Sequence, residues 1–179
     1  MKNAAKLFLS VIFTVSLCIS VEAKEPDWLI KLRKLKVFSS TKTDVEKVFD
    51  IPKVTEIYNY AEREKDGWSM RVDYETDEGE LEAEYSIGKC SENRSTIGYD
   101  VDKDVVVDLT FRPNIPFFQT DLEYDLKTFE AERVTDIENA YIFSNYELGT
   151  ELYIVDKKVE KIDFVKTEKH KALKCKNKE

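Results

Sequence analysis

The chain has few of the residues on which several common classes of protein depend. Its 179 residues include five Gly, four Pro, three Cys and one His. So little glycine and proline excludes collagen and flexible low-complexity chains. With 28 Lys and Arg against 36 Asp and Glu, the net charge is −8, which argues against a general nucleic-acid binder. The sequence also contains no Gly-rich phosphate loop, G-x-S-x-G elbow or H-E-x-x-H motif.

The single histidine, His170, lies in a highly charged segment, residues 166–171 (KTEKHK). A histidine in a catalytic triad must be held in a packed, partly desolvated site, so we expect His170 to be a solvated surface residue. One histidine and widely spaced cysteines also lack the closely spaced ligand pairs of a zinc site. We therefore predict no catalytic residue, no metal site and no cofactor.

The first 23 residues have the pattern of a secretory signal peptide. Lys2 and Lys6 precede an uncharged stretch, residues 7–21, and Ala23 offers the small residue that a signal peptidase requires. A transmembrane helix is the alternative, but about 15 residues fall short of the roughly 20 that cross a bilayer. A lipoprotein anchored at Cys18 is another, although no small residue precedes that cysteine. We expect cleavage after residue 23, which leaves no integral membrane segment.

Removal of residues 1–23 leaves 156 residues with 26 Lys and Arg against 35 Asp and Glu, a net charge of −9. A chain of this length can bury about two-thirds of its unfolded surface around one core. The sequence contains 42% apolar and 12% aromatic residues, which excludes a disordered chain. We therefore predict a single domain over residues 24–179, located in the periplasm or outside the cell. The oligomeric state stays open.

Two cysteines remain after cleavage, Cys90 and Cys175. Export carries them into an oxidising compartment, where paired thiols usually form a disulfide. Two free thiols or a redox-active pair are the alternatives. A bridge would join the middle of the chain to its end.

One short helix is predicted by its cap and its apolar stripe. A capping box can begin at Thr41 with Asp44 or at Thr43 with Glu46, because each pair places a hydroxyl three residues before a carboxylate. Pro52 should end the helix. The apolar stripe consists of Val45, Val48 and Phe49.

Strand-like alternation dominates the rest of the chain. It predicts six strands, in residues 68–75, 81–87, 105–111, 141–146, 151–156 and 159–165. The third strand would place Val105, Val107, Leu109 and Phe111 on one face. A turn at residues 77–79 makes the first two strands an antiparallel hairpin. We predict an α+β fold, an antiparallel sheet of six or seven strands with short helices on one face.

The two halves of the chain suggest a tandem duplication. A shift of 86 positions aligns residues 44–51 with residues 130–137, with identities at four positions. The first repeat would span residues 36–112, a linker 113–124, and the second repeat 125–175, which would open with a helix at 129–134. Chance similarity between two short helices is the alternative.

Several short motifs resemble the landmarks of a set of small exported bacterial proteins of unassigned activity. They are residues 40–46 (STKTDVE), 85–90 (YSIGKC), 104–107 (DVVV) and 173–175 (LKC). The resemblance implies export, one domain and pairing of Cys90 with Cys175, and it implies no reaction. At the level of fold, a repeated helix-and-hairpin unit is also similar to the β-lactamase-inhibitor proteins and the outer-membrane assembly lipoproteins. That similarity implies a sheet that binds a partner.

Acidic residues are concentrated in the first hairpin, where residues 73–84 contain seven carboxylates and no base. On the polar face of its two strands, like charges repel unless a cation or a basic partner lies over them. A Ca²⁺ site, a surface for a basic partner and a carboxylate pair for glycoside hydrolysis are functional interpretations. A solvated face, neutralised by Lys and Arg from elsewhere, is the structural one. The four candidate residues are Asp73, Glu75, Glu82 and Glu84.

From these patterns we expect an exported, non-enzymatic binding or structural module that holds a protein partner on a face of its sheet. The alternative is an extracytoplasmic carboxylate-dependent hydrolase with one or more of these four residues among its acids. A cleft with one carboxylate against an apolar wall would favour the hydrolase.

Overall fold

The computed structural model describes residues 25–51, 56–59, 69–90, 98–165 and 167–175. The predicted signal peptide lies outside these residues. Within the described part of the chain, no helix combines the length and the apolar character needed to span a bilayer.

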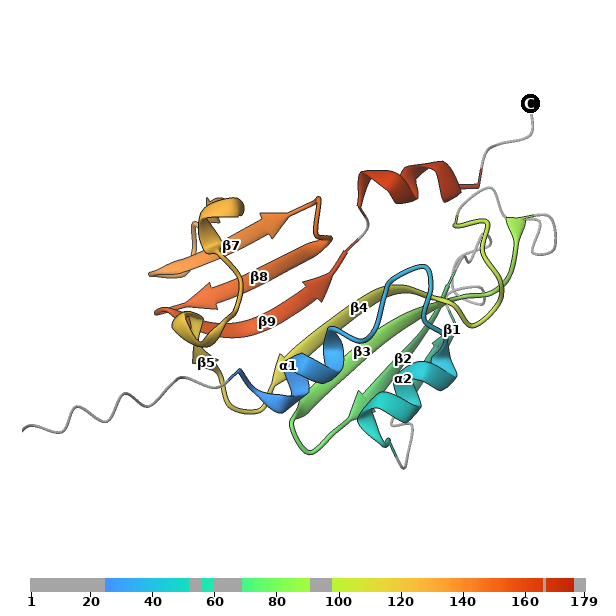
Figure 1. The fold of residues 1–179 in the computed structure, drawn as a ribbon, viewed down its shortest axis with the longest axis horizontal. Helices are drawn as coiled ribbons and strands as arrows, with labels where there is room; N and C mark the ends of the chain where they lie inside the picture. Colours follow the sequence, from blue (N-terminus) through green and yellow to red (C-terminus); the bar gives the residue numbers. More distant parts are fainter. Residues whose placement is uncertain (1–24, 52–55, 60–68, 91–97, 166, 176–179) are drawn as a thin grey trace, which may run out of the picture.

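In the described part of the chain, nine strands form one antiparallel sheet in the order β1-β2-β3-β4-β9-β8-β7-β6, with β5 paired to β9 (Figure 1). The strands are β1 (Glu56–Asn59), β2 (Ser69–Glu75), β3 (Gly79–Ser86), β4 (Val106–Pro113), β5 (Phe117–Phe118), β6 (Glu130–Arg133), β7 (Ala140–Asn145), β8 (Thr150–Val155) and β9 (Lys158–Phe164). The predicted α+β class with an antiparallel sheet is confirmed. The six strands expected from alternation correspond to β2, β3, β4, β7, β8 and β9, and the other three have two to four residues each.

The helices are few and short, as expected. They are α1 (Asp27–Leu32), α2 (Lys42–Phe49) and three 3₁₀ helices, η1 (Gln119–Asp121), η2 (Leu126–Thr128) and η3 (Glu168–Leu173). Thr41 caps α2, since its Oγ1 accepts from the Asp44 amide and the Asp44 carboxylate accepts from the Thr41 amide. The first of the two proposed capping boxes is therefore the real one. The helix ends before Pro52 because Asp50 adopts a left-handed conformation (φ 50°).

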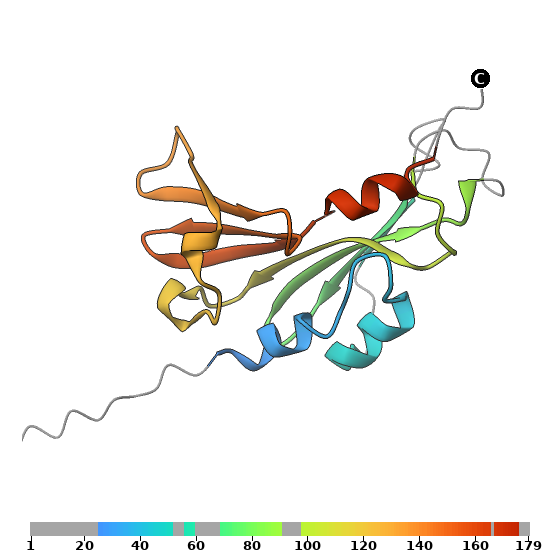
Figure 2. The same cartoon turned by 45° about the horizontal axis from the view of Figure 1, so that its top comes forward.

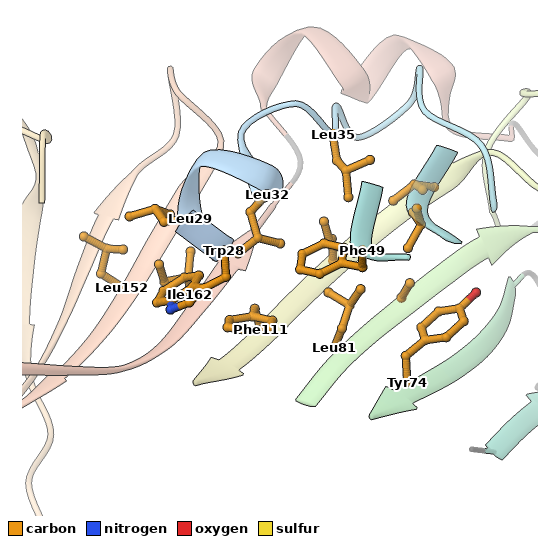
Figure 3. Packing of buried hydrophobic residues seen from close by; sticks show 14 of the residues in the cluster. Trp28, Leu29, Leu32, Leu35, Phe49, Tyr74, Leu81, Phe111, Leu152 and Ile162 are labelled. Atoms are coloured by element: carbon orange, nitrogen blue, oxygen red, sulfur yellow. The ribbon is translucent and has the colours of Figure 1, made fainter. Parts of the chain in front are cut away.

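Helices α1 and α2 pack on one face of the sheet and bury its apolar side chains (Figure 3). Trp28 of α1 lies with its ring centroid 4.6 Å from that of Phe111, and Phe49 of α2 stacks on the same ring at 6.0 Å. Leu29 points toward Leu152 on the far side of the β4–β9 junction. Each large side chain buried here contributes about 1.5–3 kcal/mol. This burial fixes which face of the sheet is left for polar residues.

Strands from the two halves of the chain meet at β4 and β9. Only three residue pairs join these strands, among them Thr110 with Asp163. The start of β4 instead bonds to the segment before α2, where the Phe38 amide donates to the Val106 carbonyl (2.7 Å). In Figures 1 and 2, β9 diverges from β4 toward η3. The two parts of the sheet are therefore connected by a short stretch of pairing between β4 and β9.

The prediction of a helix at residues 129–134 is wrong, because Glu130–Arg133 forms strand β6. All four of its side chains are exposed, so a helix here would have no apolar stripe to bury, and pairing with β7 satisfies its backbone instead. The segment aligned with it, residues 44–51, is helical through Phe49. The structure therefore does not show the duplication.

The face predicted for the third strand also needs correction. Glu84 pairs with Asp108 but Tyr85 pairs with Val106, so a bulge interrupts the β3–β4 ladder. The bulge shifts the alternation of side chains between the two faces of β4 by one residue, so Val106 rather than Val107 belongs to the core cluster.

The predicted linker, residues 113–124, is only partly irregular. It contains β5 and η1, and Phe117 packs edge-on against Trp28 with 5.1 Å between the ring centroids. Phe118 remains 54% exposed.

Candidate functional site: the acidic sheet face

The face of the sheet opposite α1 and α2 carries the polar side chains. Residues directly opposite in an antiparallel pair share a face, so the register links Asp73 to Glu82, Glu82 to Thr110, Thr110 to Asp163 and Asp163 to Glu151. This row crosses five strands without a gap. The structure thus extends the predicted acidic hairpin across the β4–β9 junction.

We call this surface the acidic sheet face. Its carboxylates are Asp73, Glu75, Glu80, Glu82, Glu84, Asp108, Glu151 and Asp163, and its cations are Arg71, Arg112 and Lys161. Among the described residues, eight carboxylates and three cations give this face an excess of negative charge. All four residues predicted from the sequence belong to it.

Arg71 is the central cation of the first hairpin. Its Nε lies 2.8 Å from Asp73 Oδ1, and its guanidinium also lies 2.8 Å from Glu82 Oε2 on the neighbouring strand. One guanidinium therefore bridges two carboxylates whose cross-strand repulsion would otherwise destabilise the pair. The side chains of Arg71 and Asp73 are each 30% exposed, so water screens part of this attraction.

Arg112 adds a second cation beside Glu82, at 3.4 Å. Together with Glu75 and Glu80, which oppose each other across the hairpin, these side chains line a hollow of about 250 Å³. Glu75, Glu80 and Arg112 are exposed. Charged groups, rather than apolar side chains, dominate the mouth of the hollow.

Asp163 is held from two sides at the junction. The Thr110 hydroxyl donates to Asp163 Oδ1 at 2.7 Å, and Lys161 Nζ lies 2.6 Å from Oδ2. Next along the row, the Ser144 hydroxyl donates to Glu151 at 2.9 Å. These bonds fix the acidic side chains in position, so the face is ordered before anything binds to it.

The disulfide predicted between Cys90 and Cys175 is present, with 5.6 Å between the Cα atoms. Beside it the Cys175 amide donates to the Gly98 carbonyl (2.9 Å), and Tyr99 forms a β-bridge with Lys174. The bridge therefore ties η3 to the loop that precedes β4. Such bonds are characteristic of oxidising compartments.

His170 is less solvated than the sequence suggested. Its ring lies 4.3 Å from that of Phe38, and its Nδ1 accepts from the Thr167 amide at 3.1 Å. Burial, reinforced by the charge of Lys169, lowers the pKa of His170 below its usual value. Its ring contacts the Phe38 phenyl group and the amide and hydroxyl of Thr167, which gives it a structural role in η3.

Among the residues that the structure describes, no three His, Cys, Asp or Glu side chains are grouped so that they could hold a metal ion. The acidic sheet face instead binds its own arginines and lysine. What this arrangement offers chemically is a fixed array of hydrogen-bond acceptors with negative charge in excess.

No protein-family model, no curated protein and no solved structure matches this chain. The resemblance to small exported bacterial proteins therefore stays a prediction.

Proposed function

We propose that this chain is an exported, non-enzymatic binding protein whose acidic sheet face holds a basic surface of a partner protein in the periplasm or outside the cell. The observation that carries the proposal is the excess of carboxylates on a face that α1 and α2 leave uncovered. The disulfide Cys90–Cys175 supports an oxidising location.

Opposite charge on the partner would steer the encounter and set its orientation. Arg71 and Lys161 hold Asp73, Glu82 and Asp163 in place, so little side-chain entropy is lost when a partner arrives. The exposed carboxylates Glu75 and Glu80 flank the turn of the hairpin, where a partner's Lys or Arg can reach them. Preorganisation and charge together favour a binding surface over a merely solvated one.

The alternative, a carboxylate-dependent hydrolase, finds less support in the same geometry. A proton-donating carboxylic acid needs an apolar wall, as in the general acids of glycosidases. Asp73 and Glu82 lie against guanidinium groups instead, and the hollow beside them is lined mainly by charged residues. We therefore favour binding.

A charge-reversal experiment tests the proposal. The double variant Glu75→Lys/Glu80→Lys reverses two exposed carboxylates of the face, and Asp136→Lys/Glu138→Lys makes the same change in charge in the exposed turn between β6 and β7. Each tagged protein is used to recover partners from envelope and culture fractions at low salt. We expect a stoichiometric partner with the wild type and the turn variant, at least tenfold less of it with the face variant, and its release by 0.5 M NaCl.

Recovery of no stoichiometric partner would count against the proposal. Equal loss in both double variants would also overturn it, because the effect would then come from net charge and not from this face.

A further inference from the structure

Strand β6 is one of the two strands at the ends of the described sheet. It comes last in the strand order and bonds to β7 alone among the described strands. All four of its side chains are exposed. An edge strand of this kind presents unpaired backbone groups to which another chain can add.

The register shows which backbone groups point outward. The Val134 amide donates to the Ala140 carbonyl at 3.0 Å, which makes these two residues a hydrogen-bonded pair. Because bonded and non-bonded pairs alternate in an antiparallel ladder, Glu132 also bonds toward β7, whereas Ala131 and Arg133 direct their N–H and C=O groups away from it. Two residues of β6 are therefore ready to bond a further strand.

The two sides of β6 differ in chemistry. Glu130 is opposite Ser144, which is opposite Glu151, so Glu130 and Glu132 continue the acidic sheet face to the edge. Ala131 points to the other side, into a hollow of about 510 Å³. Its lining combines apolar surface with polar groups, from Ala131, Tyr141, Phe143 and Ile154 on the one hand and Gln119, Asn139, Asp156 and Lys157 on the other. The small side chain of Ala131 leaves room there for a large apolar group.

A second copy of this chain does not fit the edge. If two β6 strands paired with Ala131 opposite Ala131, Glu130 would lie opposite Glu132 of the other copy. A shift by two residues places Glu132 opposite Glu132. Like charges directly opposite each other destabilise a pair of strands, so the charges of β6 disfavour self-association and favour a basic strand.

We propose that an extended segment of the partner protein, with alternating basic and large apolar side chains, adds to the free edge of β6. The proposal rests on the function proposed above and specifies how the partner is held. The partner's backbone bonds to Ala131 and Arg133. Its basic side chains meet Glu130 and Glu132, and an apolar side chain fills the hollow beside Ala131.

Two synthetic peptides of identical composition test this proposal, one with Lys and Leu in alternation over seven residues and one with the same residues in two blocks. Amide hydrogen exchange of the protein is followed by NMR with each peptide. We expect the alternating peptide to bind at least tenfold more tightly. It should slow exchange at Ala131 and Arg133 at least tenfold and leave the amides of Glu130 and Glu132, already bonded to β7, unchanged.

The variant Ala131→Leu places a larger side chain in the hollow and should weaken binding of the alternating peptide about tenfold. Thermal unfolding checks that the variant still folds. Thr135→Leu, in the exposed turn that follows β6, is the control and should bind like the wild type. Equal binding of the two peptides, or unchanged exchange at Ala131 and Arg133, overturns strand addition. The recovery experiment on the acidic sheet face decides the proposed function separately.

Discussion

The phenolic oxygens of Tyr74 and Tyr85 lie 2.9 Å apart in the core of the first hairpin. Tyr74 is 1% exposed and Tyr85 is fully buried. Each hydroxyl therefore gives the other a hydrogen-bond partner where water has little access. The pair links the apolar sides of β2 and β3 directly beneath the acidic sheet face.

Replacing one partner should cost more than replacing both. Tyr85→Phe leaves the Tyr74 hydroxyl without this bond in a buried site, and we expect it to lower the free energy of unfolding by about 1–3 kcal/mol. Tyr74→Phe/Tyr85→Phe should cost clearly less than the sum of the two single changes. Urea unfolding of the four proteins measures this coupling, and strictly additive losses would show that the bond contributes nothing.

The ionisation of Tyr74 and Tyr85 leads us to expect that the folded protein loses stability at alkaline pH. Burial raises the pKa of Tyr74 to about 12 and raises that of Tyr85 as well, whereas an unfolded tyrosine ionises near pH 10. The folded state therefore holds these protons more tightly. The stability that they contribute is complete below about pH 10 and is lost as the pH rises toward 12.

Urea midpoints at pH 8 and pH 11 should reveal this loss, and Tyr74→Phe/Tyr85→Phe should reduce it. Absorbance at 295 nm supplies a second measurement, since two of the nine tyrosines should stay protonated at pH 11 until the protein unfolds. An equal fall in stability in the wild type and the double variant would assign the pH effect to other groups.

The disulfide should contribute strongly to stability because it closes a long loop. Cys90 and Cys175 are 85 positions apart, for which the chain-entropy model gives about 4.5 kcal/mol. Cys90→Ser/Cys175→Ser should therefore lose about 2–5 kcal/mol in urea unfolding. Non-reducing mass spectrometry should find the protein lighter by two hydrogens, and two thiols open to alkylation would contradict the bond.

A partly buried ion pair anchors the chain just before α1. Arg33 Nη1 lies 2.7 Å from Glu25 Oε2, and the Glu25 side chain is only 6% exposed. Burial raises the pKa of Glu25, although Arg33 opposes the shift, and Oε1 has no hydrogen-bond partner among the described residues. The charged carboxylate is therefore stabilised mainly by the Arg33 guanidinium, with a smaller contribution from a backbone hydrogen bond of Glu123.

Arg33→Met should destabilise the protein at pH 7 by roughly 2–3 kcal/mol, below the usual cost for a buried pair because the Arg33 side chain is 26% exposed. A raised folded pKa means that stability is regained as the pH falls, so the loss should shrink by pH 5. Glu25→Gln/Arg33→Met should recover part of it. Thermal unfolding at both pH values is the measurement, and an equal loss at each would contradict this explanation.

Much of the fold follows from local patterns. Alternation located β2, β3 and β4 because each strand buries one side against the helices, and the hydroxyl and carboxylate of Thr41 and Asp44 identified the start of α2. The six residues of α1 were missed since so short a helix carries no distinct period. Local pattern does not predict strand β6, because pairing with β7, which follows it in the chain, decides its backbone bonding.

The candidate site, like the fold, could be predicted only in part from the sequence. Asp73, Glu75, Glu82 and Glu84 could be assigned to one face from their spacing alone, since side chains alternate along a strand. Arg71 and Arg112 could not be recognised as their partners in advance. Arg71 lies in β2 with Asp73, whereas Arg112 lies in β4. Only the register in which β3 pairs with these two strands places both arginines beside Glu82.

The acidity of one hairpin, the strand-rich architecture and the two cysteines that pair are all readable from the amino-acid sequence. Each of these depends on the identity or spacing of neighbouring residues. Long-range strand pairing, by contrast, sets the junction of β4 with β9, the continuation of the acidic row to Glu151 and the position of β6 at an edge of the described sheet. Those features depend on which distant strands pair, and that choice is made by burial of apolar surface shared across the whole sheet.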